Sequence, residues 1–132
     1  MPVKKMEHVG IRVTALEDSI EFYVRVIGLK HLYTVGEVDE PLRLAFLTFP
    51  GQESVELELV YIRDGEDLPR EGKVHHIAFT ASGIQYEYER IAKLGLSGLD
   101  PEIRSLPNGN RFFFFNGPDG EVIEFFEPAH LA

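Results

Sequence analysis

The chain has 132 residues, 44% of them hydrophobic, which is enough for the core of one domain. Its formal net charge of −9 argues against a nucleic acid or an anionic membrane surface as a partner. The lack of cysteine excludes disulfides, thiolate metal sites and a cysteine nucleophile. There is no apolar signal segment at the start, and no apolar run approaches the roughly 18 residues of a membrane span. We therefore expect a cytoplasmic protein.

The first half of the chain predicts a strand, a helix and three further strands. Residues 8–13 alternate apolar and other side chains, which is typical of a strand with one buried face. A possible capping box at Thr14 and Glu17 opens a helix whose apolar residues follow a helical period. Gly28 is the expected stop of this helix. The three later strands are expected over residues 29–35, 42–49 and 54–62.

The second half repeats this order after a polar connector at residues 64–73. A strand over residues 74–80 leads to a second capping-box pattern at Ser82 and Gln85, and the helix that follows stops at Gly95. The later strands are expected over residues 101–105, 111–115 and 121–127. Four consecutive phenylalanines in the second of these favour a central or interface strand, because both of its faces would be buried.

The repeated order predicts an α+β fold made of two tandem βαβββ modules. We expect one domain over residues 1–132, with the first module at about residues 5–62 and the second at about 74–130.

Each module begins with a strand that carries a histidine beside a small residue. His8 shares a strand face with Gly10, and His76 shares one with Ala78, so each strand leaves space for a ligand beside its histidine. The two histidines are 68 residues apart, about half of the chain, which indicates an internal duplication. His75 points to the opposite face from His76 and is interpreted as a packing or supporting residue.

The last strand of each module carries a carboxylate among apolar neighbours. Glu124 is the candidate in the second module, whereas Glu56 and Glu58 share one strand face in the first. Glu56 lies 48 residues after His8, the same spacing as between His76 and Glu124, and this favours Glu56. Mixed imidazole and carboxylate ligation suits one divalent ion such as Zn²⁺, Ni²⁺, Co²⁺, Mn²⁺ or Fe²⁺.

Over nearly its whole length, the chain resembles the vicinal oxygen chelate superfamily, which has the glyoxalase, bleomycin-resistance and extradiol dioxygenase fold. The resemblance rests on Gly117-Pro118-Asp119-Gly120 with Ile123-Glu124, on Ser19-Ile20-Glu21-Phe22-Tyr23 leading to Gly28-Leu29, and on His76-Ile77-Ala78-Phe79. It implies two modules that form half-barrel sheets, with the helices on the outer face.

Among the members, the chain looks most like glyoxalase I and methylmalonyl-CoA epimerase. This resemblance implies one divalent metal per site, with Zn²⁺ or Ni²⁺ first. The metal ligands that it implies are His8, Glu58, His76 and Glu124. The family pattern Glu-Leu-x-Tyr thus favours Glu58 where the spacing favours Glu56, and both stay open here.

Arg12 shares the strand face of His8, where a guanidinium would hold a substrate carboxylate or phosphate or form a salt bridge to Glu56. The corresponding arginine of glyoxalase I contacts its glutathione substrate. This chain departs from bacterial glyoxalase I at Ile62, where that enzyme has asparagine.

The resemblance implies a metal-dependent lyase or isomerase of glyoxalase type, similar to lactoylglutathione lyase. Its substrate would be a thiol–α-oxoaldehyde adduct or a related α-hydroxycarbonyl, converted through an enediolate, with Glu58 and Glu124 as candidate bases. The alternatives are a metal-free small-molecule binding module of the bleomycin-resistance kind and an acyl-CoA epimerase. We expect a homodimer whose sites take His8 and Glu58 from one chain and the other two ligands from its partner.

Overall fold

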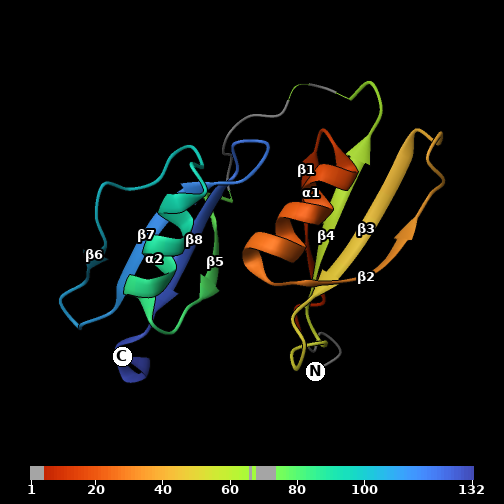
Figure 1. Ribbon diagram of the computed structural model, residues 1–132. Coiled ribbons are helices and arrows are strands. Elements are labelled where there is room, and N and C mark those ends of the chain that lie inside the picture. Colours follow the sequence, from red (N-terminus) through yellow and green to blue (C-terminus); the bar gives the residue numbers. More distant parts are fainter. Residues whose placement is uncertain (1–4, 66, 68–73) are drawn as a thin grey trace. The chain divides into compact units, whose positions relative to one another are not determined.

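The computed structural model describes residues 5–65, 67 and 74–132. The chain divides into two compact units, Met1–Leu68 and Pro69–Ala132. Each unit is a four-stranded mixed sheet with a helix laid across one face, as Figure 1 shows for each unit taken alone. The predicted α+β fold with two tandem βαβββ modules is confirmed. No helix in the described part of the chain is long and apolar enough to span a membrane.

In the first unit the sheet has the order β1-β4-β3-β2, with β1 parallel to β4 and the other neighbours antiparallel. The helix continues into a π-helical turn and buries Leu16 and Tyr23, while the sheet buries Leu47 and Leu59. The elements are β1 (His8–Val13), α1 (Leu16–Phe22), η1 (Tyr23–Ile27), β2 (Lys30–Val35), β3 (Leu42–Thr48) and β4 (Glu56–Ile62).

The second unit repeats this topology with the order β5-β8-β7-β6, in which β5 is parallel to β8. Its core joins Ile84 and Ile91 of the helix to apolar side chains of the sheet. The elements are β5 (Ile77–Thr80), α2 (Ile84–Lys93), β6 (Arg104–Ser105), β7 (Arg111–Asn116), β8 (Val122–Glu127) and the short 3-10 helix η2 (Ala129–Leu131).

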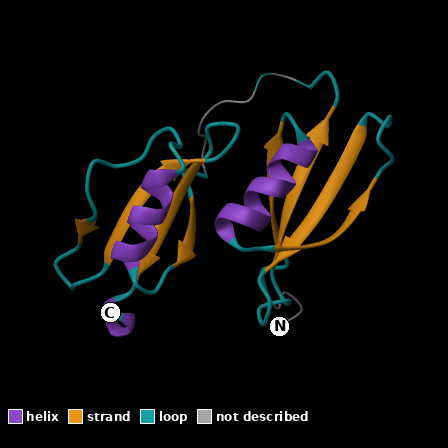
Figure 2. Cartoon of the chain, viewed as in Figure 1, coloured by secondary structure: helices purple, strands orange, loops and turns teal. Residues whose placement is uncertain are grey.

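The phenylalanine run lies on β7, a strand with neighbours on both sides. Phe113 and Phe115 are fully buried, and the ring of Phe113 packs against Tyr88 of α2. Phe112 and Phe114 are half-buried on the opposite face of the sheet. The helix therefore covers one face of the sheet and leaves the other face open within its own unit (Figure 2).

Two local predictions are wrong. Strand β5 begins at Ile77, so His76 lies just before the strand instead of within it. The predicted N-caps Thr14 and Ser82 are each one residue too early: the N-cap residues are Ala15 and Gly83, and neither of these makes a side-chain capping bond. Both predicted helix stops are confirmed, since Gly28 and Gly95 adopt positive φ angles of 99° and 67°.

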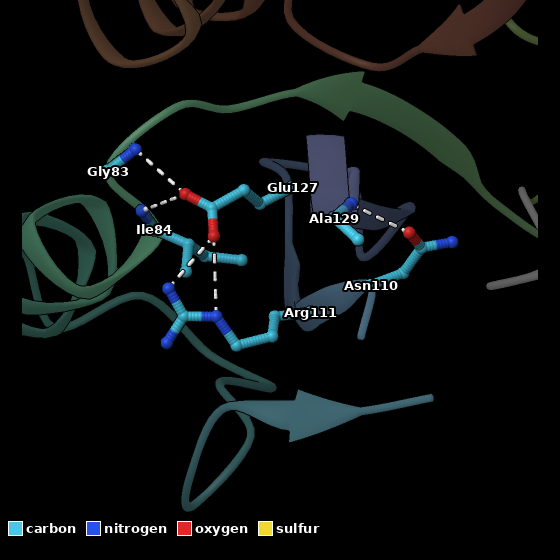
Figure 3. Close-up of polar contacts among 6 residues, drawn as sticks. All are labelled: Gly83, Ile84, Asn110, Arg111, Glu127 and Ala129. Atoms are coloured by element: carbon cyan, nitrogen blue, oxygen red, sulfur yellow. Dashed lines mark hydrogen bonds and ion pairs between the residues drawn. The ribbon is translucent and has the colours of Figure 1, made fainter. Parts of the chain in front are cut away.

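The N-terminus of α2 is instead capped by Glu127, from the last strand. Its Oε2 accepts hydrogen bonds from the backbone N–H groups of Gly83 and Ile84, at 2.9 and 3.2 Å (Figure 3). The other oxygen accepts from Arg111 Nη2 at 2.8 Å. Glu127 is 2% exposed, and its pKa lies below the ordinary value because Arg111 and then the helix N–H groups hydrogen-bond to the charged form.

Candidate metal centre

In the first unit, β1 and β4 bring a histidine and a glutamate together on the face that the helix leaves open. The parallel register sets Gly10 opposite Glu58, so the glutamate has a neighbour without a side chain. His8 Nε2 lies 3.9 Å from Glu58 Oε1. This pair, His8 and Glu58, is called the first half-site below.

In the second unit, β8 brings Glu124 to His76. The register sets Ala78 opposite Glu124, and His76 Nε2 lies 3.1 Å from Glu124 Oε1. Glu124 is only 7% exposed, and burial raises its pKa while the neighbouring His76 partly offsets that rise. The His76–Glu124 pair is called the second half-site.

The two half-sites are built on the same plan. In each, the glutamate stands opposite the residue two places after the histidine, and a phenylalanine faces it from the next strand. The ring of Phe46 lies edge-on to His8 at 6.2 Å, and that of Phe114 lies edge-on to His76 at 5.3 Å. The internal duplication therefore extends from the fold to the side chains on its open face.

This plan makes Glu58 the counterpart of Glu124. Glu56 stands opposite His8 in the register, and in the described part of the chain no ion pair joins the two. The register and the family pattern thus agree on Glu58, against the equal 48-residue spacing. Among residues 5–65, 67 and 74–132, no group of three or more potential ligands comes together, so each unit offers one pair.

The residues present fit a divalent metal ion. Ligand atoms bound at roughly 2.0–2.2 Å to one ion lie roughly 3–4 Å apart, which is the spacing within each half-site. Burying the carboxylate of Glu124 is costly unless a cation accompanies it. Each unit offers one imidazole and one carboxylate, the nitrogen and oxygen donors that suit borderline ions.

Arg12 lies at the far end of β1, about 13 Å along the strand from His8. It borders a cleft of about 280 Å³ that Tyr61, Asp64 and Gly65 also line. Its Nε is buried and has no hydrogen-bond partner within the described residues. The alternative of a salt bridge to Glu56 is not observed within that part of the chain.

The sequence analysis missed Glu7, whose Oε1 lies 3.1 Å from His8 Nδ1. His75 is exposed, and its Nδ1 lies 2.9 Å from His76 Nδ1, so it contacts a candidate ligand and does not pack in the core. Glu7 and His75 are 68 residues apart, like the two histidines that they contact. This 68-residue offset is the signal in the sequence by which Glu7 could have been identified as the counterpart of His75.

Two tandem βαβββ units, each with a histidine beside a glutamate on its open face, define the class of fold to which the chain belongs. Residues 5–125 match the Glyoxalase/Bleomycin resistance protein/Dioxygenase superfamily, and the chain belongs to that superfamily.

The chain is similar to several relatives over most of its length. It is 43% identical over 124 residues to the uncharacterized protein YwbC of Bacillus subtilis (strain 168), covering 94% of this chain and 98% of that protein. It is 32% identical over 123 residues to the lactoylglutathione lyase of Haemophilus influenzae, covering 91% and 90%. The structure of the trypanothione-dependent glyoxalase I of Leishmania major superposes with a TM-score of 0.77 at 28% identity, covering 95% and 87%.

Proposed function

We propose that the protein is a metal-dependent lyase or isomerase of glyoxalase type. Its substrate would be a thiol–α-oxoaldehyde adduct or a related α-hydroxycarbonyl. The observation that carries the proposal is the equivalent His–Glu pair in each unit, at 3.9 and 3.1 Å. The similarity to a lactoylglutathione lyase over 91% of the chain supports the same reaction class.

Four residues would hold the ion, which we expect to be Zn²⁺ or Ni²⁺, with Co²⁺, Mn²⁺ or Fe²⁺ as alternatives. They are His8, Glu58, His76 and Glu124. When bound, the ion supplies Lewis acidity that lowers the pKa of a carbon acid next to a carbonyl. The small residues Gly10 and Ala78, which face the two glutamates, leave space for substrate oxygens beside the ligands.

The protein's own part in the chemistry is to move a proton between neighbouring carbon atoms. A carboxylate oxygen of Glu124 would take the proton from one carbon of the substrate and return it to the adjacent carbon. Glu124 is the first candidate for this role because its carboxylate is sheltered from water, with the residue only 7% exposed. Glu58, with 16% of its side chain exposed, is the second candidate for this role.

Arg12 would bind an anionic group on the thiol part of the substrate. Arg12 lines the cleft at the end of β1, and its Nε has no partner in the described residues, so the guanidinium would attract a carboxylate that entered the cleft. Ile62 lines the same cleft at the position where bacterial glyoxalase I has asparagine. We therefore expect the preference among thiols to differ from that of the glutathione enzymes.

The test is to purify the untagged protein, measure its metal content and assay hemithioacetals of several thiols, glutathione among them. We expect about one ion per chain and turnover of at least one adduct. His76→Ala should lose both the ion and the turnover while it keeps its fold by circular dichroism. Protein that retains no metal after reconstitution would favour the metal-free binding module, and turnover of acyl-CoA thioesters alone would favour the epimerase.

A further inference from the structure

Each candidate imidazole ligand is held on its far side by the residue that precedes it. Glu7 Oε1 lies 3.1 Å from His8 Nδ1, and His75 Nδ1 lies 2.9 Å from His76 Nδ1. In both rings the other nitrogen, Nε2, faces the glutamate of the half-site. The duplicated modules thus repeat the supporting contact with two chemically different residues.

The contact with Glu7 sets the tautomer of His8. A carboxylate accepts hydrogen bonds and donates none, so His8 Nδ1 must carry the proton. The Nε2 atom of a neutral imidazole is then bare and able to bind a metal. His75 can either donate or accept through Nδ1, so it allows the same tautomer of His76 without imposing it.

We infer that Glu7 and His75 are positioning residues for the two metal-binding imidazoles, and that Glu7 has the larger effect. This inference rests on the proposed function, because it needs His8 and His76 to be ligands. A carboxylate partner makes an imidazole a more basic ligand and fixes its orientation, and a neutral partner does so less. Metal affinity should therefore depend more on Glu7, which supports the first half-site, than on His75, which supports the second.

If Glu7 only supported the fold, its removal would lower the stability of the protein and would not act on metal affinity separately. We expect the reverse. The Glu7 side chain is 78% exposed, and exposed ion pairs contribute little to folding stability. Its removal should therefore leave the unfolding temperature of the metal-free protein unchanged. An effect on metal affinity without an effect on stability separates positioning from structural support.

The experiment measures Zn²⁺ affinity by competition with a chromophoric chelator for Glu7→Ala, Glu7→Gln and His75→Ala. We expect Glu7→Ala to lose roughly ten- to hundred-fold in affinity, and His75→Ala to lose less. Glu7→Gln should fall between Glu7→Ala and the wild type, because its amide oxygen still accepts from Nδ1. The matched control Glu37→Ala, which removes an exposed carboxylate from the turn between β2 and β3, should bind like the wild type.

The second readout is the tautomer of His8 in the metal-free protein, observed by nitrogen–proton correlation NMR. The wild type should show the Nδ1–H form, and Glu7→Ala should shift toward the Nε2–H form that free histidine favours. His8→Ala distinguishes the two possible failures. If it binds Zn²⁺ like the wild type, the proposed ligand set fails and the inference fails with it. If it loses affinity while Glu7→Ala matches Glu37→Ala, the proposed function stands and the positioning role of Glu7 is overturned.

Discussion

At the residue scale, Glu124 has the most unfavourable position of the candidate ligands. It is 7% exposed, and its pKa is raised because burial disfavours the charged form more than His76 favours it. The metal-free protein therefore carries a destabilising charge that a bound cation would neutralise. A site that opposes folding when empty is typical of residues kept for function.

Glu124→Gln should accordingly abolish metal retention and stabilise the metal-free protein at neutral pH. Because the folded-state pKa of Glu124 is raised, its buried charge lowers the folding stability above that pKa. This loss of stability disappears as the pH falls through the pKa. The extra stability of Glu124→Gln over the wild type should then vanish at about pH 4, where the wild-type carboxyl group is itself protonated. Thermal unfolding with a chelator at both pH values measures this. A variant less stable than the wild type at neutral pH would contradict the assignment of a net unfavourable charge.

Glu58→Gln and Glu56→Gln form a matched pair on one face of β4. We expect the first to lose about a hundredfold in metal affinity, the scale of a lost ligand or its support, and the second to bind like the wild type. Only Glu58 lies within ion-pair distance of His8 among the described glutamates of that strand. The chelator competition described above measures both. Equal losses in the two variants would show that the register does not identify the ligand.

The equal 48-residue spacing favoured Glu56 for a physical reason. Counting residues from the histidine includes every loop on the way, and the two modules differ in loop length. Gly10 and its partner Glu58 are 48 residues apart, whereas Ala78 and its partner Glu124 are 46 apart. Strand register, which hydrogen bonding sets, shows the equivalence that counting along the sequence obscured.

At the element scale, the sequence predicted every strand and both helices, and it placed the beginnings of β1, β3 and β7 correctly but those of β5 and both helices too early. The helix stops were predictable because glycine alone favours the positive φ that a helix end requires. The start of α2 was not, because its capping carboxylate comes from Glu127, 43 residues away. Local patterns such as Ser82 to Gln85 do not report a cap supplied across the fold.

Glu127→Gln should destabilise the protein at neutral pH, since it removes the charge that pairs with Arg111 and with the N-terminus of α2. The folded-state pKa of Glu127 lies below its ordinary value, so its contribution is present above that value. It is lost as the pH falls through the lowered pKa. The gap in unfolding temperature between the variant and the wild type should therefore narrow below about pH 4. A gap that is constant with pH would assign the effect to packing instead of charge.

Gly28→Ala should destabilise the protein by about 1–2 kcal/mol. Gly28 ends η1 with a φ of 99°, and its N–H donates to the carbonyl of Tyr23 at 3.1 Å. An added Cβ would meet nothing within 4 Å, so the whole cost comes from the backbone. Chemical denaturation measures it, and Gly28→Asn should cost less because asparagine tolerates this conformation better. Equal stability of Gly28→Ala and the wild type would show that the turn relaxes.

At the scale of the whole molecule, each unit has its own core but only half of the proposed site. The phenylalanine run was expected on a central or interface strand; it lies on the central strand β7, where Phe113 and Phe115 are fully buried within their own unit. One group of exposed apolar side chains lies on β2, β3 and β4, on the strand face of the first half-site. They are Tyr33, Val35, Leu42 and Ile62, each at least 40% exposed. Exposed apolar clusters are typical of interaction surfaces, and this one supports the homodimer that we propose below.

The proposed site is completed either by the two modules of one chain or by modules of two chains. The sequence shows four candidate ligands but does not show which chains combine them, because each module supplies only two of the four. We propose an isologous dimer in which each site takes His8 and Glu58 from one chain and His76 and Glu124 from its partner. His8→Ala and His76→Ala should each be inactive alone. When the two are mixed, a heterodimer with shared sites has one intact site and one doubly damaged site, so each heterodimer should recover about half of the wild-type activity. Subunit exchange is confirmed by mass spectrometry of the mixed sample. If exchange is complete and no activity returns, each site is built within a single chain.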